Sequence, residues 1–369
     1  MVNGESMILE VAIALITLHF AVPIAYYATV IKWMKRPWPD VANADLPSVS
    51  IIIPTFNEAD VIGKRIINIA GQGYPLDKMN VILVDSSSDG TADEAERQAR
   101  ASGLRLSILR EEERRGKAEA LNAGLKLATG DVVVIADADA FWGANALPNA
   151  MSWFSNPKIG AVSCVKTPLS GNSTELSYRN LYNVLRVGES KKFATPIFHG
   201  ELAAFRRDLL MKLGGFPTDI GADDSHTATR IAAMGFRSII PENVTCAELV
   251  PTAGFSKWKV RRAQHLIQNF IKAIRLEYPS DFKPIIYTEF YLHVINPWIL
   301  AAAVVLLLMN HGVQAMALLA AGLAAAAWGP YRSWMVQQLY LLVASVRNLR
   351  SKELMWDKQK KPAAPKSDL

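Results

Sequence analysis

The chain has 369 residues, half of which are hydrophobic, and it carries a formal net charge of +6. The chain is too long to form only one small hydrophobic core, and its apolar content exceeds that of an ordinary soluble enzyme. We therefore expect a medium-sized domain together with membrane segments. The two cysteines, Cys164 and Cys246, fit a reducing compartment and exclude a cysteine-based metal site.

An apolar run near the N-terminus predicts a membrane-spanning helix. Residues 11–31 contain no Asp, Glu, Lys or Arg, and the roughly 20 residues that a bilayer requires fit within them. Pro23 predicts a kink in this helix. A cleaved signal peptide is the alternative, but the run is too long, and KWMKR follows it instead of small residues.

From Ser48 onward, short apolar runs alternate with helical patterns. The expected strands are SVSIIIP, NVILVDSS, LRLSILR and DVVVIADAD, and the expected helices cover residues 59–70, 92–102 and 117–128. This alternation predicts a doubly wound, mainly parallel, Rossmann-like α/β sheet. Thr91, followed three residues later by Glu94, has the spacing of a capping box.

Two carboxylates end the fourth expected strand. If Asp137 and Asp139 both lie on the strand, they point to the same side and repel each other. A hard divalent cation, Mg²⁺ or Mn²⁺, completed by phosphate oxygens, would relieve that repulsion. An ordinary acidic strand end is the alternative for so short a motif.

The C-terminal third predicts further membrane helices. Residues 285–309 and 313–328 form two apolar runs joined by a very short turn, and residues 334–346 are expected to lie in the membrane interface. Basic residues follow the first span and crowd the tail, including Lys358, Lys360 and Lys361. Three crossings, with residues 34–284 and the tail cytosolic and the N-terminus outside, satisfy the positive-inside rule. The positive charge is thus a membrane signature, and no nucleic-acid partner is expected.

The segment from Trp258 to Ile274 has an apolar stripe at helical spacing and several basic residues. Trp258, Leu266 and Phe270 belong to the stripe, and this pattern is typical of a helix on a membrane surface. We therefore expect residues 255–284 to form an interfacial region.

Several motifs occur together in a fixed order. PTFNEADVI, VDSSSDGT, RRGKAEALNAGL and ADADA are followed by HGELAAFRRDLL, KLGGFP and GADDSHTATRIAAMGFR. As a set they resemble family-2 glycosyltransferases of the GT-A fold, over about residues 48–275. The resemblance implies a nucleotide pocket at Pro54, Thr55, Glu58 and Asp85, a diphosphate contact at Lys117, metal ligands at Asp137 and Asp139, and a catalytic base at Asp224.

Three further candidate site residues have more than one interpretation. Asp223 either orients Asp224 and raises its pKa or simply caps a helix. His199 faces the donor sugar or the acceptor, or else forms only local hydrogen bonds. Trp142 stacks on a sugar or packs under a loop, and packing is the favoured interpretation.

The RRAQH stretch departs from the pattern of related enzymes. Processive and ceramide-type relatives have a Gln/Arg-x-x-Arg-Trp signature on a similar helix, where this chain has Arg261, Gln264 and His265. Arg261 is the retained position, and Arg261 or Arg262 is expected to pair with the donor diphosphate or a lipid phosphate. The alternative is that both arginines only bind anionic headgroups. Gln264 and His265 are candidate acceptor-side residues. The missing tryptophan favours a single transfer over polymer synthesis.

We therefore expect a membrane-bound, metal-dependent, inverting glycosyltransferase. It would move a sugar to a lipid or lipid-linked acceptor at the cytosolic face, and a UDP-sugar is the expected donor. The alternatives are a processive polysaccharide synthase and a non-catalytic membrane scaffold that binds nucleotide sugars. The expected organisation is a membrane helix (1–33), a GT-A domain (34–254), an interfacial region (255–284), a membrane hairpin (285–328) and an interfacial segment with a basic tail (329–369).

Overall fold

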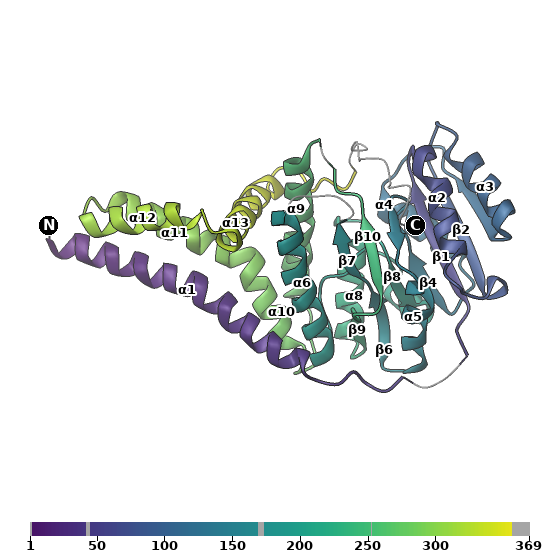
Figure 1. Ribbon diagram of the computed structural model, residues 1–369, viewed down its shortest axis with the longest axis horizontal. Coiled ribbons are helices and arrows are strands. Elements are labelled where there is room, and N and C mark those ends of the chain that lie inside the picture. Colours follow the sequence, from purple (N-terminus) through teal and green to yellow (C-terminus); the bar gives the residue numbers. More distant parts are fainter. Residues whose placement is uncertain (1, 42–44, 169–172, 252, 356–369) are drawn as a thin grey trace.

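A central sheet organises the α/β half of the protein. The computed structural model describes residues 2–41, 45–168, 173–251 and 253–355, and within them the sheet has seven strands in the order β3-β2-β1-β4-β8-β6-β9 (Figure 1). In this described sheet only β8 runs antiparallel to its neighbours. The strands are β1 (Val49–Thr55), β2 (Met79–Asp85), β3 (Arg105–Arg110), β4 (Val132–Ile135), β6 (Ile159–Ser163), β8 (Ala203–Arg206) and β9 (Arg237–Ile239). The predicted mainly parallel α/β fold is confirmed.

Helices cover both faces of this sheet because successive strand residues point to opposite sides. Ile51 and Ile53 pack with the helices on one face, whereas Ile52 packs with those on the other. The first group is α2 (Ala59–Ala70), α3 (Thr91–Ser102) and α5 (Ala146–Ser152), and the second is α4 (Lys117–Leu127), α7 (Arg207–Leu213) and α8 (Asp223–Ala233). Two short 3₁₀ turns, Leu76–Lys78 and Trp153–Ser155, complete the connections.

Two local predictions are wrong. β4 ends at Ile135, so Asp137 and Asp139 lie in a turn after the strand rather than on it. Thr91 is not a helix cap, because Gly90 occupies the cap position with φ +86°. The Thr91 hydroxyl instead contacts Asp89 and accepts a hydrogen bond from the Glu58 amide at 2.8 Å, which ties the start of α3 to the start of α2.

A second, smaller sheet lies beside the first. It consists of β5 (Ala140–Trp142), β10 (Thr245–Glu248) and β7 (Val165–Pro168), with β10 in the middle. β10 pairs antiparallel to β5 and parallel to β7. This arrangement brings Lys166 of β7 next to Cys246 of β10, although the two residues are far apart in sequence.

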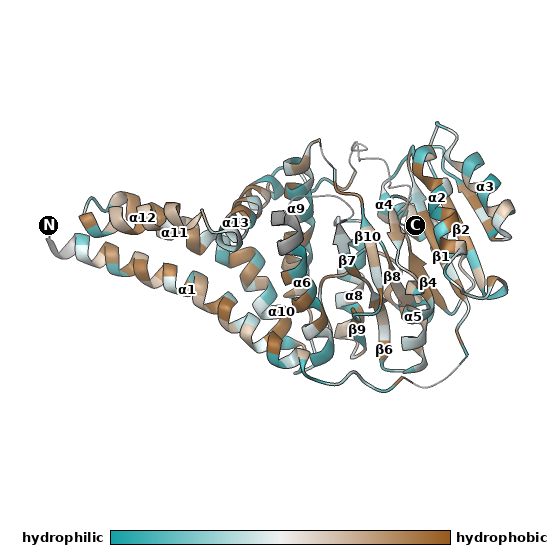
Figure 2. Cartoon of the chain, viewed as in Figure 1, coloured by the Kyte–Doolittle hydropathy of each residue, from teal (hydrophilic) through white to brown (hydrophobic). Residues whose placement is uncertain are grey.

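Among the remaining helices, α1 (Val2–Met34), α11 (Asn296–Met309) and α12 (Val313–Ala325) project away from the α/β domain, whereas α6 (Ser173–Lys192) and α9 (Phe255–Ala273) lie beside it (Figure 1). Two segments among the described residues, Glu5–Met34 and Lys283–Met309, are long and apolar enough to cross a membrane, as their hydropathy colouring indicates (Figure 2). The other helices are α10 (Lys283–Phe290), the π-helical turn η3 (Tyr291–Ile295) and α13 (Gly329–Asn348).

The third predicted crossing differs from a simple hairpin. α12 has 13 residues and is about 20 Å long, which is less than the roughly 30 Å of a bilayer core. A third span therefore requires α13 as well, and the two helices meet at a bend of 106°. The basic tail predicted at residues 358–361 lies outside the described residues.

α9 does not expose its apolar stripe to a membrane. Phe270 is fully buried among residues of α8 and α10, and Trp258 is 3% exposed. Val260 and Ile267 of the same helix pack against Leu341 of α13. The interpretation of this stripe as a membrane-surface face is therefore wrong, because helices that lie far away in the sequence cover it.

Candidate functional site

A cavity of about 1020 Å³ opens at the carboxyl ends of the parallel strands. Its wall includes Pro54 and Thr55 at the end of β1, Asp137 and Asp139 after β4, and Asp224 at the start of α8. In sheets of this kind, ligands bind outside the carboxyl ends of the strands. The structure thus brings together the residues predicted from separate motifs.

One end of the cavity has the residues predicted to hold a nucleotide. Pro54, Thr55 and Glu58 line it, but Asp85 does not, and its side chain is buried behind Thr55. Asp85 Oδ1 accepts hydrogen bonds from the hydroxyls of Thr55 (2.7 Å) and Ser87 (2.5 Å). In this structure Asp85 therefore orients Thr55 instead of facing the cavity.

An aromatic–cation pair at the same end was not predicted. The Arg114 guanidinium lies 4.0 Å from the centre of the Phe56 ring, and both residues line the cavity. Such a pair offers a flat surface on which a planar base can stack. In the sequence, the two residues of this pair are the phenylalanine of PTFNE and the first arginine of RRGK, and these could have indicated it.

Lys117 and the two aspartates after β4 form the polar centre of the cavity. Lys117 Nζ lies 2.7 Å from Asp137 Oδ1. Burial lowers the pKa of Lys117, but the charges of Asp137, Asp223 and Asp224 outweigh that effect and hold its pKa above the usual value. Lys117 is therefore a fixed positive charge in the cavity wall beside Asp137.

The carboxylates suit a hard divalent ion that takes its remaining ligands from a substrate. Asp137 and Asp139 are half-buried and line the cavity, and Mg²⁺ and Mn²⁺ favour such oxygen donors. No group of three His, Cys, Asp or Glu side chains that could hold a metal is found in the described part of the chain. The ion would therefore depend on phosphate oxygens, as the sequence predicted.

Gly200 permits the close approach of Lys117 and Asp137. A Cβ atom at Gly200 would lie 2.6 Å from Lys117 Nζ and 3.2 Å from Asp137 Oδ2. We expect Gly200→Ala to displace the flexible lysine end, raising the donor KM about tenfold through a weakened charged contact while changing Tm little. Gly329→Ala, with no heavy atom within 4 Å of the new Cβ, is the control. An unchanged donor KM in Gly200→Ala would contradict this role of Gly200.

Asp224 has the properties of a general base. It lies in the first turn of α8, and its Oδ1 accepts hydrogen bonds from the Ser225 amide (2.5 Å) and hydroxyl (3.1 Å). Burial, followed by the charge of Asp223, raises the pKa of Asp224 to about 7. A carboxylate with a pKa near neutrality accepts a proton effectively under physiological conditions.

Asp223 does not cap its helix. The cap position belongs to Ala222, and Asp223 is the first helical residue, with 5% exposure. Burial raises its pKa, and its Oδ2 has no hydrogen-bond partner among the described residues. The structure therefore favours the interpretation in which Asp223 tunes Asp224 electrostatically.

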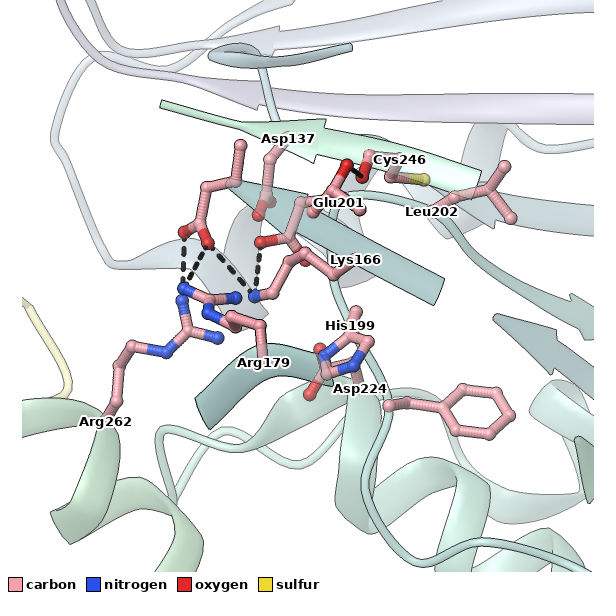
Figure 3. A network of polar contacts seen from close by, with 12 residues as sticks. Asp137, Lys166, Arg179, His199, Glu201, Leu202, Asp224, Cys246 and Arg262 are labelled. Carbon is pink, nitrogen blue, oxygen red and sulfur yellow. Dashed lines mark hydrogen bonds and ion pairs between the residues drawn. The ribbon is translucent and has the colours of Figure 1, made fainter. Parts of the chain in front are cut away.

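A cluster of charged side chains, most of them buried, forms the next part of the wall (Figure 3). Lys166 lies 2.7 Å from Glu201 and 3.2 Å from Glu248, and Glu248 also pairs with Arg179 (3.0 Å) and Arg262 (2.9 Å). These five residues line the cavity. None was predicted as a member of such a cluster, although a lysine inside VSCVKTP and a glutamate inside VTCAELV are unusual in apolar strands.

His199 lies beside this charge cluster and near Asp224 (Figure 3). Burial lowers the pKa of His199 well below its usual value, and the positive charges of Lys166, Arg262 and Arg179 lower it further. The His199 backbone exchanges hydrogen bonds with the Ser163 hydroxyl. His199 is thus a neutral side chain in the cavity wall.

Trp142 is a packing residue. It is 3% exposed, its Nε1 donates to the Glu201 carbonyl at 2.6 Å, and the Arg65 guanidinium lies 4.3 Å from its ring centre. It does not line the cavity in the described structure. The favoured packing interpretation is confirmed, and the acceptor-side assignment of Trp142 is wrong.

Gln264 and His265 hold the segment that follows α13. Gln264 is fully buried and donates to the Ser351 carbonyl at 2.9 Å, so its acceptor-side assignment is wrong. His265 Nε2 lies 3.1 Å from the Glu353 carbonyl oxygen. The same imidazole packs so closely on Gly221 that a Cβ there would lie 2.2 Å from it. His265 lines the cavity, and its ring supports the loop that leads to Asp223.

Arg261 lines the cavity and is 8% exposed. Burial, followed by the neighbouring charge of Arg262, lowers its pKa to about 10. Arg261 is therefore placed to contact a ligand in the cavity.

Gln268 links the loop that leads to Asp223 to the 351–355 segment. Its Oε1 accepts from the Gly221 amide at 3.0 Å, and its Nε2 donates to Asn348 Oδ1 (2.8 Å) and to the Lys352 carbonyl (3.0 Å). We expect Gln268→Leu to destabilise the protein by about 1–3 kcal/mol because it leaves these groups unpaired. Thermal unfolding measures the effect, with Gln98→Leu on α3 as the control. Equal Tm values for the two variants would contradict this linking role.

The site defines an α/β enzyme that binds a phosphorylated donor, and comparison with known proteins agrees. The family model described as "Glycosyl transferase family 2" matches residues 50–214. A mannosyltransferase from Pyrobaculum calidifontis, solved with GDP-Man and Mn²⁺, is 51% identical with a TM-score of 0.86, covering 93% of this chain and 99% of that one. The chain belongs to the family-2 glycosyltransferases, and its fold is GT-A.

More distant relatives match only in part. The cellulose synthase 1 catalytic subunit [UDP-forming] of Komagataeibacter xylinus is 32% identical over 58% of this chain and 30% of its own length. A poly-beta-1,6-N-acetyl-D-glucosamine synthase of Staphylococcus aureus is 26% identical over 64% of this chain and 58% of its own. The chain thus spans less than two thirds of either relative. A solved structure of S. aureus TarS (residues 1–349) shares the fold. It is 17% identical with a TM-score of 0.50, and the match covers 82% of this chain and 92% of that one.

Proposed function

We propose that this protein is an inverting hexosyltransferase that uses a divalent metal ion and transfers one sugar from a nucleotide diphosphate to a lipid or lipid-linked acceptor. The observation that carries the proposal is the convergence of Lys117, Asp139 and Asp224 on one cavity. These residues supply the charge and the base that substitution at an anomeric carbon needs.

In the proposed reaction, Asp224 takes the proton from the acceptor hydroxyl as that oxygen attacks the anomeric carbon. Lys117 holds the diphosphate of the donor. A divalent ion held by Asp139 and Asp137 would spread the charge on the departing diphosphate. A single base acting on the face opposite the leaving group inverts the anomeric configuration.

For the donor, we propose a guanosine-diphosphate hexose with GDP-mannose as the first candidate. The P. calidifontis structure contains GDP-Man and Mn²⁺, which favours this donor over the UDP-sugar expected from the sequence. The UDP-forming relative supports the alternative. Release of GDP or UDP from a panel of nucleotide sugars, with Mn²⁺ and membrane lipids, tests the proposal, and failure to turn over any of them would overturn it.

Two features support membrane attachment. Segments Glu5–Met34 and Lys283–Met309 have the length and composition to cross a bilayer, and basic residues such as Lys32, Lys35 and Arg36 follow the first. We propose that the GT-A domain lies on the cytosolic side and the N-terminus outside.

Processive synthesis of a polysaccharide is the second candidate function, since two relatives are synthases. The length of the product separates single transfer from processive synthesis.

The rate is expected to depend on pH through Asp224. Because the base works only when ionised, and because its pKa is about 7, we expect kcat/KM to rise about tenfold per pH unit below 7 and to level off above it. In Asp223→Asn we expect the rise of kcat/KM with pH to occur at lower pH than in the wild type, because the negative charge of Asp223 contributes to the raised pKa of Asp224. The same pH profile in the wild type and in Asp223→Asn would contradict this coupling.

A further inference from the structure

The ends of β1, β2 and β3 lie side by side in one part of the cavity wall. The Ser86 amide donates to the Thr55 carbonyl at 3.2 Å, and the Glu111 amide donates to the Asp85 carbonyl at 2.8 Å. Thr55, Ser86 and Glu111 all line the cavity, and we name this part the β1 end. Because β3 is the edge strand of the sheet, Glu111 marks the outer margin of the β1 end.

The spacing between Glu111 and the polar centre of the cavity suits a nucleotide. Glu111 follows β3 and Asp137 follows β4. In the sheet order β3-β2-β1-β4, the ends of these two strands are three strand spacings apart, or about 14 Å. In the proposed function the diphosphate lies at Lys117, which pairs with Asp137. The ribose and the base then extend along the sheet edge toward Glu111.

The carboxylate of Glu111 is buried and poorly paired. Its side chain is 5% exposed. Among the residues that the structure describes, its hydrogen-bond donor is Arg115 Nη2, which lies 3.5 Å from Oε1 and belongs to a side chain that is 61% exposed. This distance is beyond the usual range of a good hydrogen bond. Because a buried carboxylate is costly without donors, Glu111 indicates a ligand that supplies them.

The Phe56–Arg114 pair indicates how such a ligand would lie. The two side chains stack at 4.0 Å in the cavity wall, and aromatic rings and guanidinium planes are common platforms for nucleobases. Arg114 is three residues from Glu111 in the segment that joins β3 to α4. A base stacked on this pair presents its edge to the polar groups around it.

Guanine is the base whose edge matches a carboxylate. Its N1–H and N2–H₂ groups are adjacent donors, and the two oxygens of one carboxylate can accept from both. In uracil, one N3–H donor lies between two carbonyl oxygens that a carboxylate repels. Adenine and cytosine place an acceptor nitrogen beside their amino group. A paired, charge-assisted contact of the guanine kind is strong and geometrically specific.

We propose that Glu111 selects a guanine nucleotide by accepting hydrogen bonds from N1–H and N2–H₂ of a base that stacks on the Phe56–Arg114 pair. The inference rests on the proposed function and deepens its choice of donor, because it assigns the preference for GDP over UDP to one side chain. Glu111 thus determines specificity and takes no part in the transfer step at Asp224.

Four nucleoside diphosphates that differ only in the base test this inference. The full-length protein in detergent, with Mn²⁺, is titrated calorimetrically with the guanosine, inosine, xanthosine and uridine diphosphates (GDP, IDP, XDP and UDP). Inosine lacks the N2 amino group of guanosine, and xanthosine has a carbonyl oxygen in its place. We expect GDP to bind about tenfold more tightly than IDP, through one charge-assisted hydrogen bond, and about a hundredfold more tightly than UDP. Equal binding of GDP and IDP, tighter binding of UDP, or binding of none of the four would overturn the inference.

A matched pair of variants assigns the effect to Glu111. In Glu111→Gln the amide oxygen can accept from N1–H while the amide nitrogen donates to the C2 carbonyl of xanthine, so the ratio of XDP to GDP affinity should rise about a hundredfold. A reversal of this kind cannot result from misfolding. Glu113→Gln, which is exposed on the same segment and outside the cavity wall, is the control and should keep the wild-type order. An unchanged ratio in Glu111→Gln contradicts the assignment, and the comparison of GDP with IDP in the wild type carries the test if that variant does not fold.

Sugar transfer by the wild-type protein is measured in the same preparation. Transfer from a nucleotide hexose without a preference for GDP refutes only the role of Glu111. A preference for GDP that depends on Glu111, without transfer from any nucleotide sugar, refutes only the proposed function.

Discussion

Asp224→Asn is expected to reduce sugar transfer by about 10²–10⁴-fold, the usual contribution of a positioned general base. The asparagine has nearly the same shape but cannot accept the proton of the acceptor hydroxyl. Donor binding should remain, because Lys117 and Asp139 are unchanged. Steady-state transfer and the donor Kd measure the two effects separately.

Asp223→Asn is the matched control for this experiment. It removes a neighbouring carboxylate and leaves Asp224 in place, so transfer should persist with a shifted pH profile. Transfer by Asp224→Asn at the wild-type rate would remove Asp224 from the role of base. Loss of donor binding in Asp224→Asn would instead indicate a structural role.

Asp139→Asn should reduce kcat/KM by about 10²–10³-fold, the scale for loss of one group that stabilises developing charge. It should also raise the Mn²⁺ concentration needed for half-maximal activity. Asp137→Asn is the comparison, because Asp137 is already paired with Lys117 at 2.7 Å. We expect the larger change in Mn²⁺ dependence at Asp139.

Activity must also disappear with a chelator in the wild-type enzyme and return with added Mn²⁺. Full activity in the presence of the chelator would contradict the role of the ion. An equal Mn²⁺ dependence in the wild type and Asp139→Asn would remove Asp139 from the metal site.

The sheet and the catalytic centre were predictable because their signals are local. Ile51, Ile52 and Ile53 form a continuous apolar run, since a strand covered on both faces has no polar side. The motifs around Lys117 and Asp224 are short segments at strand ends or helix starts. Their convergence follows from the topology of a parallel sheet, in which the carboxyl ends of the strands meet.

Features that depend on distant partners were not predictable in the same way. The stripe on α9 resembled a membrane face because the sequence gives no indication that Phe270 packs among residues of α8 and α10. Lys166 and Glu248 lie on strands that are far apart in the sequence, and the pairing of β7 with β10 brings them together, whereas Glu201 reaches Lys166 from the segment before β8. Gln264 was assigned to the acceptor side by resemblance, whereas its partner is the Ser351 carbonyl.

The central claim is that the enzyme adds a single sugar to a lipid acceptor. The most direct measurement is the mass of the product formed when the purified full-length protein, Mn²⁺ and GDP-mannose are incubated with extracted membrane lipids. The account predicts one lipid species heavier by a single hexose residue, absent with Asp224→Asn. A ladder of masses spaced by hexose units, or a soluble polymer, would contradict it.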